Sequence, residues 1–262
     1  MKKLLLVVSL VVGFISSAWA GVSVPYNYKL IESKDYGGYQ LRKKRNDELY
    51  VVIVDLQKVN VNFGLVDKAS SGNSFKKHYM YTWWNSYAIS NTYAMFNGQF
   101  FNVKTARTTP LSFPLRSNYR NIVTQVDPGQ LKTLKIYNGG KSAQILYDYY
   151  SYYLNGSKEL IVGLDPNVNK GKNVSQGRFY IAGVHDNNSK LRYLLFFIAK
   201  SKTQYQMENE ISRWRIDIDT DVVMMDGSGS AQMKTRPKTL YADGIPAYRR
   251  LPNIITISKR LW

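Results

Sequence analysis

The chain has 262 residues, of which 44% are hydrophobic and 14% aromatic, and its formal net charge is +18 at pH 7. This composition excludes a disordered chain, and the lack of cysteine excludes disulfides, thiolate metal sites and a cysteine nucleophile. With two histidines, a multi-histidine metal centre is excluded as well. The positive charge favours anionic partners such as phosphorylated glycans, lipid head groups or nucleic acid, and it also favours solubility beside an acidic envelope.

The N-terminus predicts a secretory signal peptide over residues 1–20. A positive start is followed by the apolar run Leu4–Ile15, and the small-x-small pattern of a cleavage site precedes Gly21. The run is too short for a membrane span, and no stop-transfer charge follows it. We therefore expect a bacterial periplasmic or secreted protein with one domain over residues 21–262 and no transmembrane segment after cleavage.

Further along the chain, hydrophobic patterning predicts more strands than helices. Runs of β-branched and aromatic residues predict strands at 48–56, 58–63, 93–96, 190–199, 221–225 and 254–258. A helix is predicted over 73–86, and another follows Thr203, which begins a capping box. Turn signals separate the middle strands, and residues 170–176 are predicted to form a mobile loop. Together these elements predict a single-domain α+β fold: mixed, strand-rich twisted sheets with a few packing helices.

One stretch has the pattern of a reactive site. An apolar strand ends at Asp226, and the glycine-rich turn Gly227–Ser230 follows at once. An acid at the end of a buried strand, beside a turn that presents backbone N–H groups, is a common arrangement in catalytic and anion-binding sites. The turn has neither the lysine and spacing of a P-loop nor the dinucleotide-binding fingerprint. A tight strand-to-helix turn is the structural alternative.

A second stretch, Asn97–Phe101, follows another predicted buried strand. Asn97 offers both a donor and an acceptor where the strand ends. Two phenylalanines are adjacent in it, so one is expected to pack inward while the other lines a cleft. Considered alone, the stretch is typical of an ordinary turn.

Two further patterns each have a functional and a structural interpretation. Asp217, Asp219 and Asp221 resemble the start of a calcium loop, but Val222 stands where that loop needs glycine, so the exposed face of a strand is favoured. The segment Tyr147–Tyr153 holds five tyrosines, which can stack on sugars or bases or be plain strand residues.

Taken in order, these motifs resemble the phosphodiester glycosidase domain family, which includes the lysosomal uncovering enzyme and many bacterial envelope proteins. The family's Asn-Gly-Gly-Phe-Phe resembles Asn97–Phe101, and its Asp-Gly-Gly-Gly-Ser-Ser resembles Asp226–Ala231. Its closing Arg-Pro-Val-x-Asn resembles Arg249–Asn253. Gln99 and Ser228 stand where the family has glycines.

The resemblance implies hydrolysis of a sugar joined through its anomeric carbon to a phosphodiester. Ordinary glycosidases use two carboxyls, but phosphate is a weakly basic leaving group, so one carboxylate can suffice. Asp226 is then the base or oxocarbenium stabiliser, Arg249 and the turn amides hold the phosphate, and Asn97 orients the substrate. No metal or cofactor is required, and Asp243 is the spare carboxylate. The expected catalytic residues are Asp226, Asn97 and Arg249, and the expected substrate-binding residues are Gly98, Phe101, Arg178, Gly227, Ser228, Gly229, Ser230 and Asn253.

Two other functions remain open at this stage. One is a non-catalytic envelope protein that binds an anionic glycan or a peptidoglycan fragment in the same cleft. The other is a secreted nucleic-acid-binding protein with strongly salt-dependent affinity, although no specific nucleic-acid motif is present. The ionisation of Asp226 separates an enzyme from a glycan binder, because a binder needs mainly its basic and aromatic residues.

Overall fold

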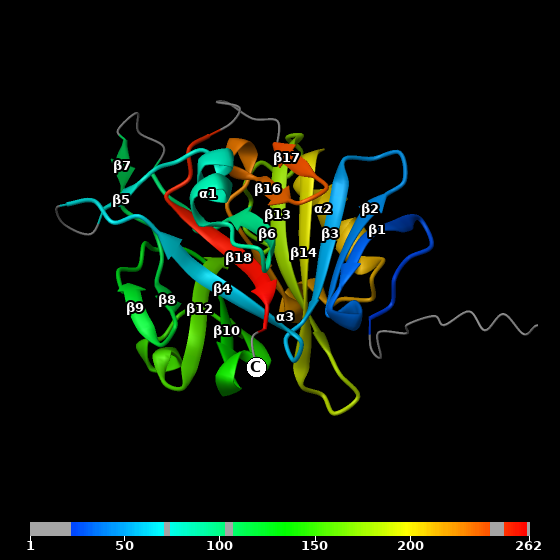
Figure 1. Ribbon diagram of the computed structural model, residues 1–262, viewed down its shortest axis with the longest axis horizontal. Helices are drawn as coiled ribbons and strands as arrows, with labels where there is room; N and C mark the ends of the chain where they lie inside the picture. The colour runs from blue at the N-terminus through cyan, green and yellow to red at the C-terminus, as the bar shows by residue number, and fades with distance from the viewer. Residues whose placement is uncertain (1–21, 71–73, 103–106, 242–248, 261–262) are drawn as a thin grey trace, which may run out of the picture.

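Strands dominate the computed structural model, which describes residues 22–70, 74–102, 107–241 and 249–260 (Figure 1). The predicted signal peptide and Asp243 lie outside the described residues. The helices within these ranges are α1 Met80–Tyr87, α2 Gln204–Ser212 and α3 Ile218–Asp221. The strands are β1 Tyr28–Lys34, β2 Tyr39–Lys44, β3 Leu49–Asp55, β4 Val59–Val66, β5 Phe75–Lys76, β6 Thr92–Asn97, β7 Thr108–Thr109, β8 Leu115–Ser117, β9 Arg120–Val123, β10 Leu131–Tyr137, β11 Ser142–Tyr147, β12 Ser157–Leu164, β13 Gln176–His185, β14 Leu191–Lys202, β15 Val222–Met224, β16 Gln232–Thr235, β17 Thr239–Tyr241 and β18 Asn253–Lys259.

Two antiparallel sheets form the fold. The larger has the order β1-β2-β3-β14-β11-β10-β12-β15-β13, with β8 and β9 attached at β12, and β13 also pairs with β14 so that the sheet returns on itself. The smaller has the order β17-β16-β6-β18-β4, and β5 pairs separately with β7. Figure 1 shows β4, β18, β6 and β16 lying in front of the long strands β13 and β14.

The main core lies between the two sheets. Phe96 of β6 stacks on Phe179 of β13 and Phe196 of β14, with ring centroids 5.4 and 5.1 Å away. The next residue, Phe197, points to the opposite face of the larger sheet, where its ring packs edge-on against Trp214 at 5.5 Å. Because both faces of β14 are covered, the strand is continuously apolar from Tyr193 to Ala199, and that run is what identifies it in the sequence.

The predicted fold class is wrong. Strands make up 49% of the structure and helices 15%, so the fold is mostly β rather than α+β, and every strand pairing among the described residues is antiparallel rather than mixed. A mixed sheet needs crossover connections, which usually contain a helix, whereas hairpins such as β13–β14 and β10–β11 join neighbouring strands here. No helix in the described ranges is long and apolar enough to cross a bilayer.

Most individual elements agree with the predictions. The strands predicted at 48–56, 58–63, 93–96, 190–199, 221–225 and 254–258 correspond to β3, β4, β6, β14, β15 and β18. The capping box is also confirmed: Thr203 Oγ1 accepts from the Gln206 N–H at 3.1 Å, and Gln206 Oε1 accepts from the Thr203 N–H at 3.0 Å.

The helix predicted over 73–86 is shorter than expected. The first part of that segment is β5, whose pairing with β7 draws it away from a helix, and α1 begins at Met80. His78, between them, forms an isolated antiparallel bridge with Leu251. Tertiary pairing has therefore overridden the local helical pattern over half of the segment.

The ends of β6 and β18 form a tight joint. The first residue of β18, Asn253, donates from Nδ2 to the Phe63 carbonyl at 2.7 Å, and its Oδ1 accepts from the Gln99 N–H at 3.0 Å. The Gly98 N–H donates to the Asn253 carbonyl at 3.1 Å. A Cβ at Gly98 would lie 1.7 Å from Asn253 Oδ1, so only glycine fits there without moving the asparagine.

We expect Gly98→Ala to lower the free energy of unfolding by about 2–4 kcal/mol, because the added methyl group displaces a buried, fully bonded asparagine. Gly129→Ala is the matched control, since its Cβ would meet only Leu131 and Leu164, both at 3.6 Å. Urea unfolding of both variants checks this. Equal stability of the two proteins would contradict the packing described for Gly98.

Candidate functional site

Asp226 lies where β15 ends. The Met225 N–H donates to the Phe179 carbonyl at 2.9 Å, and the chain then leaves the sheet, with the Asp226 carboxyl buried at its edge. Burial raises the pKa of this carboxyl to about 6, although the Ser230 hydroxyl, the Arg249 charge and the Gly227 N–H act in the opposite direction. Asp226 Oδ2 has no hydrogen-bond partner within the described part of the chain.

The turn after Asp226 brings a hydroxyl and a guanidinium to the carboxyl. Residues Ser228–Ser230 form a single 3₁₀ turn, and Ser230 is fully buried. Arg249 Nη1 donates to Ser230 Oγ at 3.0 Å. The structure thus brings together Asp226, Ser230 and Arg249, which the sequence analysis had grouped from segments far apart in the chain.

Ser228 adopts φ 52°, in the left-handed region that favours glycine. The resembling family carries glycine at this position, so the backbone conformation there is one that glycine adopts freely and serine adopts at some cost. Gly227 faces a different constraint, because a Cβ there would lie 2.9 Å from the Gly177 carbonyl oxygen.

Asn97 holds the turn from the smaller sheet. Its Nδ2 donates to the Asp226 carbonyl at 2.8 Å, and its Oδ1 accepts from the Gln232 N–H at 3.0 Å. Both halves of the amide are therefore bonded to backbone on either side of the turn. Through these bonds Asn97 positions Asp226, whereas direct contact of Asn97 with a substrate stays a prediction.

Arg178, on β13, holds a loop rather than an open anion site. Its guanidinium is buried and donates to the carbonyls of Lys170, Gly171, Val174 and Lys202 at 2.6–3.1 Å. Burial lowers the pKa of this guanidinium. The segment predicted as a mobile loop is thus tied to β13 by Arg178, and a direct role of Arg178 in substrate binding stays a prediction.

A cavity of about 430 Å³ lies beside the Asp226 carboxyl. Its volume and its mixture of aromatic rings with a few polar groups are typical of small-molecule sites. Residues that line it include Phe100, Lys170, Arg178, Tyr180, Asp226 and Ser228.

Two of the residues that line this cavity carry a buried polar atom without a hydrogen-bond partner. Like Asp226 Oδ2, the buried Tyr180 hydroxyl has no hydrogen-bond partner among the described residues. Burial raises the pKa of Tyr180, so the hydroxyl stays protonated and available as a donor. Leaving such groups unbonded costs about 1–3 kcal/mol each, and a ligand in the cavity that bonded to them would recover this cost.

As predicted, one of the two adjacent phenylalanines packs inward and the other lines a cavity. Phe101 forms a bridge with Leu111 and lies in the main core, and its expected contact with a substrate stays a prediction. Phe100 instead lines the cavity and packs edge-on against Phe113 at 5.6 Å. The reason is the alternation of side chains along extended backbone once Phe101 is paired.

Of the remaining predicted residues, Gly98 and Asn253 form the joint described above, while Gly229 lies buried inside the turn. Tyr180 was not among the predicted site residues. It lies two residues after Arg178 on β13, so the period-two spacing of a strand places both on the same face and could have pointed to it. Within the described ranges, no group of three or more histidine or acidic side chains is placed to hold a metal ion.

The fold resembles that of known structures. The catalytic domain of zebrafish N-acetylglucosamine-1-phosphodiester α-N-acetylglucosaminidase, auto-inhibited by its pro-peptide, is similar with a TM-score of 0.54 and 15% identity over 89% of this chain and 82% of that chain. A hypothetical protein from Synechocystis is similar with a TM-score of 0.47 and 9% identity over 89% of this chain and 61% of that chain. No protein-family model and no curated protein sequence matches. The first likeness shows a shared fold and a distant relation.

We expect Asp226→Asn to stabilise the protein at neutral pH. Because folding raises the pKa of Asp226, ionisation of this carboxyl destabilises the fold. The stability contributed by the protonated carboxyl is complete below pH 4 and is lost as the pH rises through about 6. Removing the charge should raise the free energy of unfolding by roughly 2–3 kcal/mol at pH 7.5 and change it little at pH 4. Thermal unfolding at the two pH values measures the difference, and an equal effect at both would contradict the buried charge.

Phe101→Ala should lower the free energy of unfolding by about 3–5 kcal/mol, as expected for a core phenylalanine. Phe100→Ala should cost markedly less, because that ring is only partly buried and borders the cavity. Urea unfolding compares the two variants directly. A larger loss for Phe100→Ala would mean that the two rings have exchanged places.

Proposed function

We propose that this protein is a hydrolase that cleaves the bond between the anomeric carbon of a sugar and a phosphodiester. One observation carries the proposal: a buried carboxyl with an unbonded oxygen borders a cavity, next to a turn that carries an arginine-bonded serine. The likeness in fold to a phosphodiester glycosidase supports the same class of reaction.

The chemistry suits a single carboxylate. With a pKa of about 6, Asp226 is about nine-tenths ionised at pH 7, so it can accept a proton from water or stabilise positive charge on the sugar ring. The C1–O bond to phosphate breaks, water supplies the new hydroxyl, and the phosphate leaves without needing a strong acid. Tyr180 and Phe100, which line the same cavity, supply a hydroxyl donor and a ring face for the sugar.

In this proposal Arg249 binds the phosphate. Its guanidinium donates to Ser230 Oγ at the turn after Asp226, and a guanidinium binds phosphate oxygens well. Its charge also favours the ionised form of Asp226. The same arginine therefore serves both substrate binding and the state of the carboxylate.

The place of action is also part of the proposal. The N-terminal sequence has the features of a signal peptide, and a bacterial envelope or extracellular glycan would provide the sugar phosphodiester. The chain's charge of +18 suits such an anionic substrate.

Hydrolysis of a panel of sugar-1-phosphodiesters by the mature protein tests this function. We expect sugar release by the wild type, a loss of about 100-fold or more in Asp226→Asn, and a rate that rises with pH through about 6 as the carboxyl ionises. Asp186→Asn is the control, because that exposed aspartate belongs to the turn between β13 and β14. Unchanged turnover in Asp226→Asn would overturn the role of Asp226.

A glycan-binding protein without catalysis is the second candidate. It is favoured by the engagement of Asn97, Arg178 and Asn253 in bonds that hold backbone, which leaves few polar side chains at the cavity for chemistry. It predicts that no substrate in the panel is cleaved and that Asp226→Asn binds anionic glycans as tightly as the wild type.

A further inference from the structure

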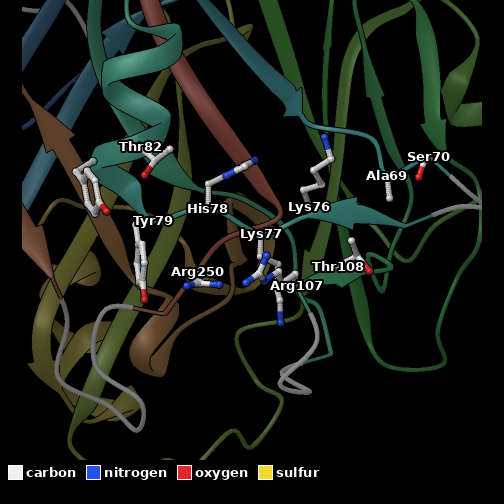
Figure 2. Close-up of a pocket in the computed structure, with 11 residues that line it drawn as sticks. Ala69, Ser70, Lys76, Lys77, His78, Tyr79, Thr82, Arg107, Thr108 and Arg250 are labelled. Carbon is white, nitrogen blue, oxygen red and sulfur yellow. The ribbon is translucent and has the colours of Figure 1, made fainter.

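A second cavity, of about 610 Å³, is lined mainly by basic and aromatic side chains (Figure 2). It shares no lining residue with the Asp226 cavity. Figure 2 shows Lys77, Arg107 and Arg250 grouped in its middle, with Tyr79 beside Arg250. Residues that line it include Lys76, Lys77, His78, Tyr79, Arg107 and Arg250.

Backbone pairing brings these cations together from three distant segments. β5 pairs with β7, and the pairing continues where the Lys77 N–H donates to the Arg107 carbonyl at 2.9 Å. His78 and Leu251 then exchange two hydrogen bonds of 3.0 and 2.7 Å, which places Arg250 beside Lys77. The cluster is therefore fixed by the sheet-like backbone rather than by chance contacts of long side chains.

Neither Arg107 nor Arg250 forms an ion pair with a carboxylate in the described ranges. The nearby Asp67 is engaged by Lys76 at 3.2 Å and by His78 at 2.9 Å. Burial and then the charges of Arg250 and Arg249 lower the pKa of Lys77, as expected where like charges are crowded.

A basic cavity elsewhere on the protein differs in this respect. It has a volume of about 590 Å³, and the residues that line it include Lys43 and Lys44 at the end of β2 and Arg45 just after it. There, Lys43 pairs with Glu48, and Lys44 pairs with Glu210. Basic composition alone therefore does not distinguish the second cavity; the convergence of Lys77, Arg107 and Arg250 does.

Aromatic rings complete the second cavity. Tyr79 and Tyr81 stack with centroids 5.6 Å apart, and the Arg250 guanidinium lies over the Tyr79 ring at 4.8 Å. α1 begins at Met80 with no side-chain cap, so the positive end of the helix adds to the local potential. Cations beside flat ring faces suit a phosphate group joined to a sugar.

We propose that this cavity is a second phosphate-binding subsite, which binds a phosphate of the glycan outside the bond that is cleaved. Arg249 contacts Ser230 beside Asp226, and its neighbour Arg250 lines the second cavity, so the two anion positions are adjacent along the chain. The substrate is then a glycan with repeated phosphate groups. That last statement rests on the proposed function, whereas phosphate binding by the cavity does not.

Calorimetric titration of the mature protein with inorganic phosphate at low salt tests the subsite. We expect Arg107→Gln and Arg250→Gln each to weaken binding about tenfold, because each removes a charge-assisted hydrogen-bond donor. Lys43→Gln, in the cavity near β2, removes the same charge from a lysine paired with Glu48 and should change affinity by less than twofold. Equal affinities in all three variants would overturn the proposal, because the bound phosphate would then lie elsewhere.

Two further measurements separate this inference from the proposed function. Asp226→Asn should bind phosphate at the subsite as tightly as the wild type, whether or not it hydrolyses any sugar phosphodiester. If hydrolysis is found, Arg250→Gln should raise KM for a substrate with a second phosphate and leave KM for a single phosphodiester unchanged. Displacement of phosphate by oligothymidylate, with affinity that grows with length, would instead identify a nucleic-acid site and overturn the glycan assignment.

Discussion

The amide of Asn97 is the interaction on which the site depends. It bonds to the backbone on both sides of the turn, to the Asp226 carbonyl and to the Gln232 N–H, and so fixes the end of β15 against the end of β6. Both bonds are buried, where an amide left unbonded is costly and a mispositioned turn would lose both. The Asp226 carboxyl can then be held in an unfavourable, buried place because the backbone that carries it has little freedom to move it toward water.

The two departures from the resembling family's motifs leave this arrangement intact. Gln99 stands at a glycine position, but its Nε2 donates to the Pro114 carbonyl at 2.9 Å and its N–H keeps the bond to Asn253. Ser228 accepts a left-handed backbone conformation at a modest cost, while the turn around it stays closed by the bond from the Ser230 N–H to the Gly227 carbonyl. Local contacts thus accommodate both substitutions, and the position of Asp226 does not depend on them.

Local patterns in the sequence were enough to predict the strands and the capping box, and the resemblance to a known family is what grouped Arg249 with Asp226 and Ser230. Local patterns were not enough where a long-range pairing decides the outcome. Phe101 faces the core because it pairs with Leu111, and the sequence has no local mark of that bridge. The partners of Arg178 are backbone carbonyls, which no residue pattern reveals. The direction of strand pairing, and with it the fold class, depends on connections in the same way.

The charges around the turn have opposing effects on the ionisation of Asp226. Burial favours the protonated form of Asp226, and a phosphate bound nearby would add negative charge that favours that form still more. Arg249 acts against both effects, because its positive charge attracts the phosphate and favours the carboxylate at once. A site of this kind needs its cation beside the acid rather than remote from it, since Coulomb interactions weaken with distance and with exposure to water. The bond from Arg249 to the buried Ser230 hydroxyl holds the guanidinium near Asp226, so the serine influences the ionisation of the carboxyl both directly and through the position of the arginine.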